Sequence, residues 1–151
     1  QDAVVPCDQS MYIQGFPTDY MKSIYNAANV LCHVTMDEGF GVPIVEAQAC
    51  GTPVIAGGWT SMPELVGAGY VISREDSEPW WNPTGGFQRV PHVSAIEQAL
   101  LKAYEEREND ISIQARESAL EYDANHVAKM YWGLVLSEIE EKIDRESSSQ
   151  P

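Results

Sequence analysis

Two glutamates, Glu38 and Glu46, are the residues of this sequence whose type and spacing best suit a chemical role. They stand eight residues apart in the stretch DEGFGVPIVEAQACGTPVIAGG, residues 37–58. Spacing alone proves nothing, because Glu97 and Glu105 repeat it inside an ordinary helical pattern. The context differs here, since an ionised carboxylate offers only hydrogen-bond acceptors and can take two hydroxyl donors. Two such groups around a glycine-containing turn predict a site for a ligand that carries hydroxyl groups.

A helix must position these glutamates, and we expect it to begin at about Gly41 to Pro43. Proline suits the first turn of a helix, where its missing N–H costs no hydrogen bond. Glu38 then lies in the preceding turn, and Glu46 lies about one turn inside the helix. Both carboxylates are therefore expected near one end of the same helix, just past the carboxyl end of the strand predicted at residues 30–35.

The start of this helix also predicts an anion site. Helix N-termini present unpaired N–H donors and partial positive charge, which bind a phosphate without any lysine. Glycine lets a ligand approach the backbone closely. We therefore predict a diphosphate on the amides of residues 41–44 and sugar hydroxyls on the two carboxylates, the shape of a nucleotide-sugar. The alternative stays open that Glu46 only complements the helix dipole and the glycines only turn the chain.

The surrounding pattern predicts an α/β fold. Strands are expected at residues 11–15, 30–35, 53–56 and 70–73, and helices at 18–28, with Thr18 as its cap, and at 42–50, ended by Gly51. Residues 61–67 are expected to form a short helix or a turn. Such alternation favours a Rossmann-like, doubly wound parallel sheet with helices on both faces. Sheets of this kind bind ligands beyond the carboxyl ends of their strands.

The second half of the chain changes character. Residues 75–91 hold three prolines and two adjacent glycines, which predict an irregular loop. Its Trp80 and Trp81 either fold back on the domain or contact an acceptor, a lipid surface or a partner. Three amphipathic helices are expected after it, at residues 93–107, 111–122 and 124–143. The apolar stripe of the last helix either closes the domain's own core or promotes self-association.

Length and charge limit the possible functions. The chain has 151 residues with 44% apolar content, enough for a single domain, which we place at residues 1–145, before a disordered tail at 146–151. It carries 9 basic and 23 acidic residues, and only Lys22 is basic before Arg74. Such a surface is not suited to tracking nucleic acid phosphates, so nucleic acid is excluded as a partner.

Cysteine and histidine usage indicates neither disulfides nor a metal. The three cysteines are Cys7, Cys32 and Cys50, and no C-x-x-C pair occurs among them. Because Cys32 and Cys50 lie in apolar segments, we predict buried, reduced thiols. The three histidines have no ligand spacing and stand far apart, at His33, His92 and His126. No run is long and apolar enough to cross a bilayer. We therefore expect a cytoplasmic protein without a bound metal, and contact with a membrane surface is left open.

Residues 38–67, EGFGVPIVEAQACGTPVIAGGWTSMPELVG, closely resemble the E-x7-E signature of the retaining glycosyltransferases of family 4, also called group 1. Residues 11–35 are similar to the run that leads into that signature. The resemblance is dense over residues 11–72 and continues by pattern only to residue 131. It implies the C-terminal, donor-binding half of the two-domain GT-B fold, and hence transfer of a hexose from a nucleotide-sugar to an acceptor.

The resemblance also implies roles for individual residues. Glu38 would be catalytic, contacting hydroxyls of the donor sugar near the reacting carbon, and Glu46 would hold the ribose hydroxyls of the nucleotide. Backbone amides for the sugar and the phosphates would come from Gly39, Phe40, Gly41 and Val42. A second rank consists of Thr35, where the family usually has serine, of Gly15 beside the base, and of Glu64 in the PEL motif.

Parts of the family pattern are missing. The basic Arg and Lys pair that neutralises the leaving diphosphate has no counterpart in residues 1–10, and no acceptor-binding domain precedes this half. The implied partners are therefore a nucleotide-sugar, as substrate and with no cofactor, and a missing N-terminal acceptor-binding domain. Little turnover is expected from this chain alone. Two alternatives remain, a regulatory module that binds nucleotides without catalysis and a GT-B sugar-nucleotide epimerase.

Overall fold

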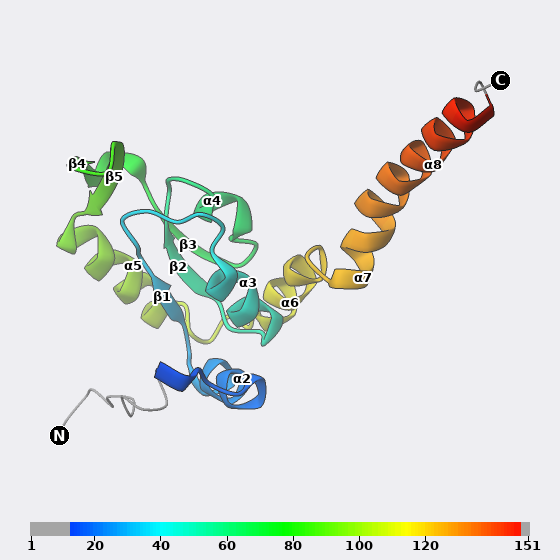
Figure 1. Cartoon of the computed structure of the whole chain (residues 1–151). Coiled ribbons are helices and arrows are strands. Elements are labelled where there is room, and N and C mark those ends of the chain that lie inside the picture. The colour runs from blue at the N-terminus through cyan, green and yellow to red at the C-terminus, as the bar shows by residue number, and fades with distance from the viewer. Residues whose placement is uncertain (1–12, 149–151) are drawn as a thin grey trace.

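A three-stranded parallel sheet with helices on both faces forms the body of the computed structural model, which describes residues 13–148 (Figure 1). The strands are β1 (Leu31–His33), β2 (Val54–Gly57) and β3 (Gly69–Ile72), in the spatial order β1-β2-β3. The helices packed on the sheet are α3 (Val42–Ala49), α4 (Met62–Leu65) and α5 (Val93–Glu105). Helices α3 and α4 connect successive strands in the same direction and lie on one face, while α5 covers the other. The predicted α/β fold is confirmed.

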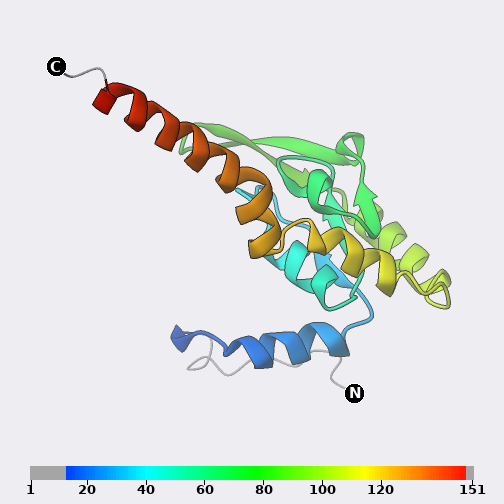
Figure 2. The same ribbon diagram turned by 90° about the vertical axis from the view of Figure 1, so that its right-hand side faces the viewer.

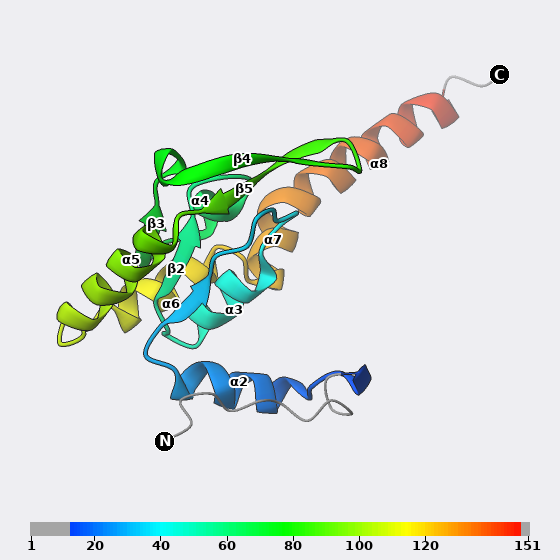
Figure 3. The same cartoon turned by 90° about the vertical axis from the view of Figure 1, so that its left-hand side faces the viewer.

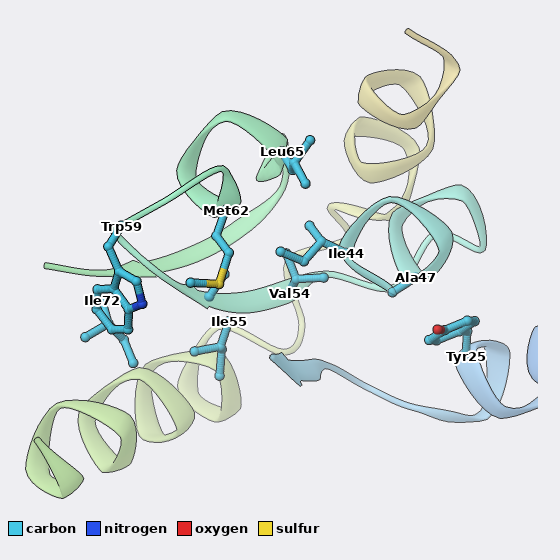
Figure 4. Packing of buried hydrophobic residues seen from close by; sticks show 10 residues of the cluster. Tyr25, Ile44, Ala47, Val54, Ile55, Trp59, Met62, Leu65 and Ile72 are labelled. Atoms are coloured by element: carbon cyan, nitrogen blue, oxygen red, sulfur yellow. The ribbon is translucent and has the colours of Figure 1, made fainter. Parts of the chain in front are cut away.

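The central strand β2 organises the core. Val54, Ile55 and Ala56 are fully buried, because helices cover both faces of this strand. In Figure 4, Ile55 points towards α5, while Met62 of α4 descends onto the strand from the other side. Each fully buried aliphatic side chain contributes about 1.5–3 kcal/mol relative to exposure. This packing fixes the carboxyl ends of the three strands at one edge of the sheet.

A buried polar side chain, Gln48, fastens α3 to the segment that enters β3. Its amide nitrogen donates to the carbonyl oxygens of Ile44 and Leu65, at 3.1 and 2.7 Å. Its amide oxygen accepts from the backbone N–H groups of Gly67 and Ala68, at 2.8 and 2.9 Å. Because a buried amide satisfied on both sides has only one favourable position, Gln48 holds the helix in register with the sheet.

The prediction of an irregular loop at residues 75–91 is wrong. After the short 3-10 helix η1 (Arg74–Asp76), β4 (Ser77–Asn82) and β5 (Gly86–Pro91) form an antiparallel hairpin. Its prolines fit because a two-stranded ribbon consists of two edge strands, each with N–H groups outside the ladder. Gly85 makes the turn, with a φ of 103° and a hydrogen bond from its N–H to the Asn82 carbonyl oxygen.

The N-terminal elements differ in two places from the prediction. Ile13 and Gln14 are helical, so the strand expected at residues 11–15 is wrong where the structure describes it, and residues 11 and 12 lie outside the described part. Helix α2 runs from Thr18 to Ala27 with Pro17 as its N-cap, one residue before the predicted cap. Proline is tolerated at this position because its fixed φ is compatible with the start of a helix.

The C-terminal helices leave the body of the domain. α6 (Ser112–Leu120) packs on α3, and the chain continues through α7 (Ala124–Val127), the π-helical segment η2 (Ala128–Trp132) and α8 (Gly133–Ser148). Figures 1 and 2 show α8 extending away from the sheet. Its apolar residues are exposed, among them Leu134, Val135 and Ile139, so the stripe does not close the core of the described domain. The helix runs three residues into the tail predicted from residue 146, and residues 149–151 lie outside the described part.

The burial predicted for the cysteines is only partly correct. Cys32 is exposed and Cys50 is half-buried, both as free thiols, and Cys7 lies outside the described residues. Cys32 is exposed because β1 is an edge strand of the described sheet. Among residues 13–148, no helix combines the length and the apolar character needed to cross a membrane.

Candidate functional site

The N-terminus of α3 lies at the carboxyl edge of the sheet and presents free backbone amides. Gly41 is its N-cap, with a φ of 104°, and Pro43 follows in the first turn, as the sequence predicts. No side chain caps this helix, and none of the hydrogen bonds among residues 13–148 uses the N–H groups of Gly39, Phe40, Gly41 or Val42. Because these donors are unpaired, they carry the partial positive charge of the helix end and suit an anion. The anion site predicted on the amides of residues 41–44 is wrong for its second half, because Pro43 has no N–H and the N–H of Ile44 donates to the Gly41 carbonyl oxygen at 2.9 Å.

Glu38 lies in the loop between β1 and α3 and is held by a histidine. Its Oε2 is 3.0 Å from Nε2 of His33, the last residue of β1. The side chains of His33 and Glu38 are 14% and 25% exposed, so this pair is shielded but reachable by a ligand. The backbone N–H of Glu38 donates to Oδ1 of Asp37 at 3.0 Å. The carboxylate therefore has a fixed direction, and its other oxygen has no hydrogen bond from any residue between 13 and 148.

Glu46 lies one turn into α3, exposed on the side that meets α2. Oη of Tyr25 donates to its Oε2 at 3.0 Å. Tyr25 itself is buried, and Figure 4 shows its ring beside α3 near Ala47. Burial, together with the hydrogen bond and the negative charge of Glu46, raises the pKa of Tyr25 to about 12. The phenol thus stays protonated and orients the carboxylate, which leaves the other oxygen for a ligand.

A groove of about 460 Å³ runs along α3 beside Glu46. Its other wall comes from α6 and the turn to α7, where Arg116, Tyr122 and Asp123 line it. Tyr122 also packs edge-on against Phe40, with ring centroids 5.9 Å apart. The described chain therefore brings one cation, Arg116, and one aromatic ring to the helix that carries the candidate anion site.

The loop that contains Glu38 and Phe40 is tied to the neighbouring connection. Oγ of Ser61 donates to the Phe40 carbonyl oxygen at 2.7 Å, and the indole N–H of Trp59 donates to the Thr35 carbonyl oxygen at 3.0 Å. The hydroxyl of Thr35 is directed to Sδ of Met62 at 3.4 Å. Thr35 thus contributes to the support of the loop through both its backbone and its side chain.

Two residues of the second rank lie apart from this arrangement. Gly15 precedes α2, with a φ of 80° and no atom within 4 Å of the place where a Cβ would be. It lies at the opposite end of α2 from Tyr25, which meets Glu46. Glu64 is exposed in α4, and no hydrogen bond or ion pair of its side chain occurs among the described residues.

Three residues that hold the site were missed by sequence reasoning, namely His33, Tyr25 and Ser61. His33 ends a strand at the carboxyl edge of the sheet, five residues before Glu38, and that position was a usable signal. Tyr25 is 21 residues from its partner and Ser61 is 21 residues from Phe40, so only the packed structure brings them together. Within the described part of the chain, no group of histidine, cysteine and acidic side chains could hold a metal ion.

Comparison with known proteins gives the same family at several levels of similarity. The family model described as "Glycosyl transferases group 1" matches residues 7–118. The chain is 41% identical over 66 residues to O-antigen chain mannosyltransferase B of Escherichia coli, and 34% identical over 79 residues to a D-inositol 3-phosphate glycosyltransferase of Saccharomonospora viridis. It is 30% identical over 85 residues to the O-antigen chain mannosyltransferase RfbU of Salmonella typhimurium.

The matches take up much of this chain but little of the relatives. They cover 43%, 50% and 56% of this chain, in the same order, and 17%, 18% and 24% of the three relatives. The chain thus spans only a minor part of the length of the relatives that it matches. The fold has a parallel sheet and a free helix N-terminus, and the family model matches residues 7–118. The chain therefore belongs to the group 1 glycosyltransferases.

Proposed function

We propose that this chain is the donor-binding part of a retaining glycosyltransferase of GT-B fold, which transfers a hexose from a nucleotide-sugar to an acceptor. The observation that carries the proposal is the arrangement around α3, where unpaired amides at residues 39–42 lie between two oriented carboxylates. An anion bound to these amides is stabilised both by the helix dipole and by hydrogen bonds from several N–H donors. A diphosphate between two sugars matches this alternation of donor and acceptor groups.

The two carboxylates have separate tasks in this proposal. Glu46, held by Tyr25, accepts hydrogen bonds from the ribose hydroxyls, and Glu38, held by His33, accepts them from the donor sugar near its reacting carbon. During transfer, the bond between that carbon and the diphosphate oxygen breaks, and the acceptor hydroxyl oxygen bonds to the same carbon. The hydroxyl proton leaves with the diphosphate, so charge is balanced. The retained stereochemistry rests on the E-x7-E resemblance.

The rest of the enzyme is part of the same proposal. Stabilising a leaving diphosphate is mainly an electrostatic task, which requires preorganised cations. Lys22 is the one basic residue before Arg74, and the described site adds only Arg116 from α6. We therefore assign the missing cations to a segment of the donor-binding domain outside this chain, and the acceptor-binding surface to an N-terminal domain. Little transfer is expected from the chain alone, although nucleotide binding should persist.

The test is calorimetric titration of the chain with GDP, UDP and ADP. GDP-mannose joins the panel because two of the relatives are named mannosyltransferases. Hydrogen bonds to a charged group contribute about 1.5–3 kcal/mol, so Glu46→Ala should weaken the best ligand by about tenfold or more. Glu97→Ala is the matched control, since Glu97 has the same E-x7-E spacing on α5 and is exposed. Equal affinities for parent and Glu46→Ala would remove the ribose assignment.

A further inference from the structure

The loop Gly39–Phe40–Gly41 requires contacts with other elements to hold its amides in one direction. A glycine on each side of Phe40 gives the backbone a wide choice of conformations. At Gly39, nothing in the described chain lies within 4 Å of the place where a Cβ would be. A loop that is ordered only when the ligand arrives lowers the affinity, because its conformational freedom is lost on binding. The contacts that fix this loop beforehand therefore matter for binding.

Two peptide planes of the loop are fixed through their carbonyl oxygens. In a trans peptide, the C=O and the following N–H lie in one plane and point in opposite directions. Oγ of Ser61 donates to the Phe40 carbonyl oxygen at 2.7 Å, and this bond fixes the direction of the Gly41 N–H. The N–H of Ile44 donates to the Gly41 carbonyl oxygen at 2.9 Å and fixes the Val42 N–H in the same way. Both N–H groups therefore point away from these bonds.

The Phe40 N–H is restrained through a side chain instead. It shares its peptide with the Gly39 carbonyl oxygen, which accepts no hydrogen bond from any residue between 13 and 148. The Phe40 ring packs edge-on against Tyr122, with ring centroids 5.9 Å apart and an interplanar angle of 77°. Because the ring and the backbone of Phe40 are joined at one Cα, a fixed ring limits the rotation of the backbone and of its N–H.

Tyr122 comes from an element that is itself fixed to α3. It lies in the turn between α6 and α7, and α6 packs along α3. The N–H of Tyr122 donates to the Ala119 carbonyl oxygen at 3.0 Å, which holds the turn to the end of α6. Figures 2 and 3 both show this turn beside the start of α3. The contact with Phe40 thus connects the loop to a supported part of the molecule.

The position of this ring pair separates it from the other exposed rings. Trp80 and Trp81 of the hairpin are exposed, and Trp81 packs against Phe87 of the same ribbon. Phe40 and Tyr122 instead come from two elements that are distant in sequence. They are 49% and 38% exposed, and neither belongs to the hydrophobic core that the described residues form. Burial in the core therefore does not account for their contact.

We propose that Tyr122 and Ser61 are positioning residues, which hold the Phe40 loop in the conformation that binds the diphosphate of the donor. This inference rests on the proposed function, because it concerns the same anion site. Ser61 directs the Gly41 N–H, and Tyr122 directs the Phe40 N–H. Neither side chain has to touch the ligand. Losing one of them lowers the fraction of molecules whose loop is ready, and the apparent affinity falls by that fraction.

The test is nitrogen-15 NMR and calorimetry of the chain with GDP, UDP, ADP and inorganic pyrophosphate, which occupies the amides without a ribose. Tyr122→Ala should shift the amide signals of residues 39–41 in the free protein. It should also weaken pyrophosphate and the best nucleoside diphosphate by the same factor, about three- to tenfold, the order of an aromatic pair. Tyr122→Phe keeps the ring and should retain most of the affinity. Tyr122→Leu replaces Tyr122→Ala if the alanine variant does not fold.

Ser61 is tested through its hydroxyl group. Ser61→Ala should displace the Gly41 amide signal most strongly and weaken the same two ligands, whereas Ser61→Thr, which keeps a hydroxyl, should restore binding. Tyr131→Ala is the matched control for the ring, because it removes an exposed tyrosine from η2. It should leave the signals of residues 39–41 and both affinities unchanged.

Each opposing result has a separate meaning. Signals of residues 39–41 that stay in place in Tyr122→Ala, or an affinity equal to that of the parent, would overturn the positioning role and leave the donor site intact. An equal loss in Tyr122→Phe and Tyr122→Ala would overturn the role of the ring pair. If no nucleoside diphosphate binds the parent, the proposed function fails, and the amide signals of the free protein alone decide whether Tyr122 and Ser61 hold the loop.

Discussion

At the scale of single residues, the site depends on two neighbours that orient its carboxylates. His33 and Tyr25 each make one hydrogen bond to a glutamate of the E-x7-E pair, at 3.0 Å in both cases. A carboxylate held in this way loses less conformational freedom on binding than a free one. The pair His33–Glu38 is proposed to bind the donor sugar, and the pair Tyr25–Glu46 is proposed to bind the ribose. The two pairs can therefore be tested separately.

His33→Leu should weaken a nucleotide-sugar by about tenfold and leave the corresponding nucleoside diphosphate unaffected. The reason is that Glu38, which loses its hydrogen-bond partner, is assigned to the transferred sugar and not to the nucleotide. Calorimetry with both ligands measures the difference, and His33→Gln should restore part of the affinity by supplying a donor. An equal loss for both ligands would mean that His33 supports the fold and does not position Glu38.

Tyr25→Phe should remove a step near pH 12 from the alkaline titration of the tyrosines. Because the pKa of Tyr25 is raised from 10.0 to about 12, folding favours its neutral form. Its stabilising effect is complete below pH 10 and is lost as the pH rises through about 12. Ultraviolet absorbance of tyrosinate follows the titration, with Tyr131→Phe, an exposed ring, as the control. A parent protein without a step near pH 12 would contradict the Tyr25 assignment.

The sequence predicts the positions of the two glutamates but not their partners. Pro43 and Gly41 mark the start of α3 through local backbone preferences, so Glu38 and Glu46 can be placed relative to the helix end without a structure. Tyr25 reaches Glu46 only because α2 packs against α3. A contact of this kind depends on the packing of separate elements, which no local pattern encodes.

At the scale of elements, glycine at position 41 makes the abrupt start of α3 possible. Gly41 has a φ of 104°, and a Cβ there would lie 3.0 Å from Cδ1 of Leu65. Gly41→Ala should therefore destabilise the fold by on the order of 1–3 kcal/mol, the cost of such a backbone conformation for a residue with a side chain. Chemical denaturation measures this loss. Gly39→Ala is the control, because no atom lies within 4 Å of its Cβ position, and an equal loss in both variants would contradict the assignment.

The elements also mark where sequence reasoning fails. The helices at residues 42–49 and 93–105 and the strands at 54–57 and 69–72 were predictable from periodicity and turn residues. The hairpin at residues 77–91 was not, because its prolines and glycines are typical of loops. Pro79 is accommodated opposite Arg89, whose own N–H points outward to Met36. The ribbon thus depends on a tertiary contact that compensates for weak local strand preference.

At the scale of the whole molecule, the apolar side chains of α8 remain exposed in the part of the chain that the structure describes. The helix extends from the body, and its exposed residues include Leu134, Val135, Leu136, Ile139 and Ile143. In the proposed enzyme, a domain outside this chain covers part of this surface. Without that domain, exposed apolar surface of this extent favours association between copies of the chain. The net charge of −14 opposes such association, so it should depend on salt.

The double variant Val135→Glu/Ile139→Glu should therefore be monomeric where the parent associates. Val135 and Ile139 are one helical turn apart on the same side of α8, so two charges there interrupt the apolar stripe. Sedimentation velocity over a range of protein concentrations, at low and high salt, should show the parent shifting to a larger species, more strongly at high salt. Ser137→Glu adds a charge to another side of the same helix and should behave like the parent. The melting temperature of the double variant should equal that of the parent, because no side chain of α8 belongs to the hydrophobic core that the described residues form. A lowered melting temperature would mean that α8 supports the domain itself, and a double variant that still associates would move the contact to another surface, with the hairpin as the next one to test.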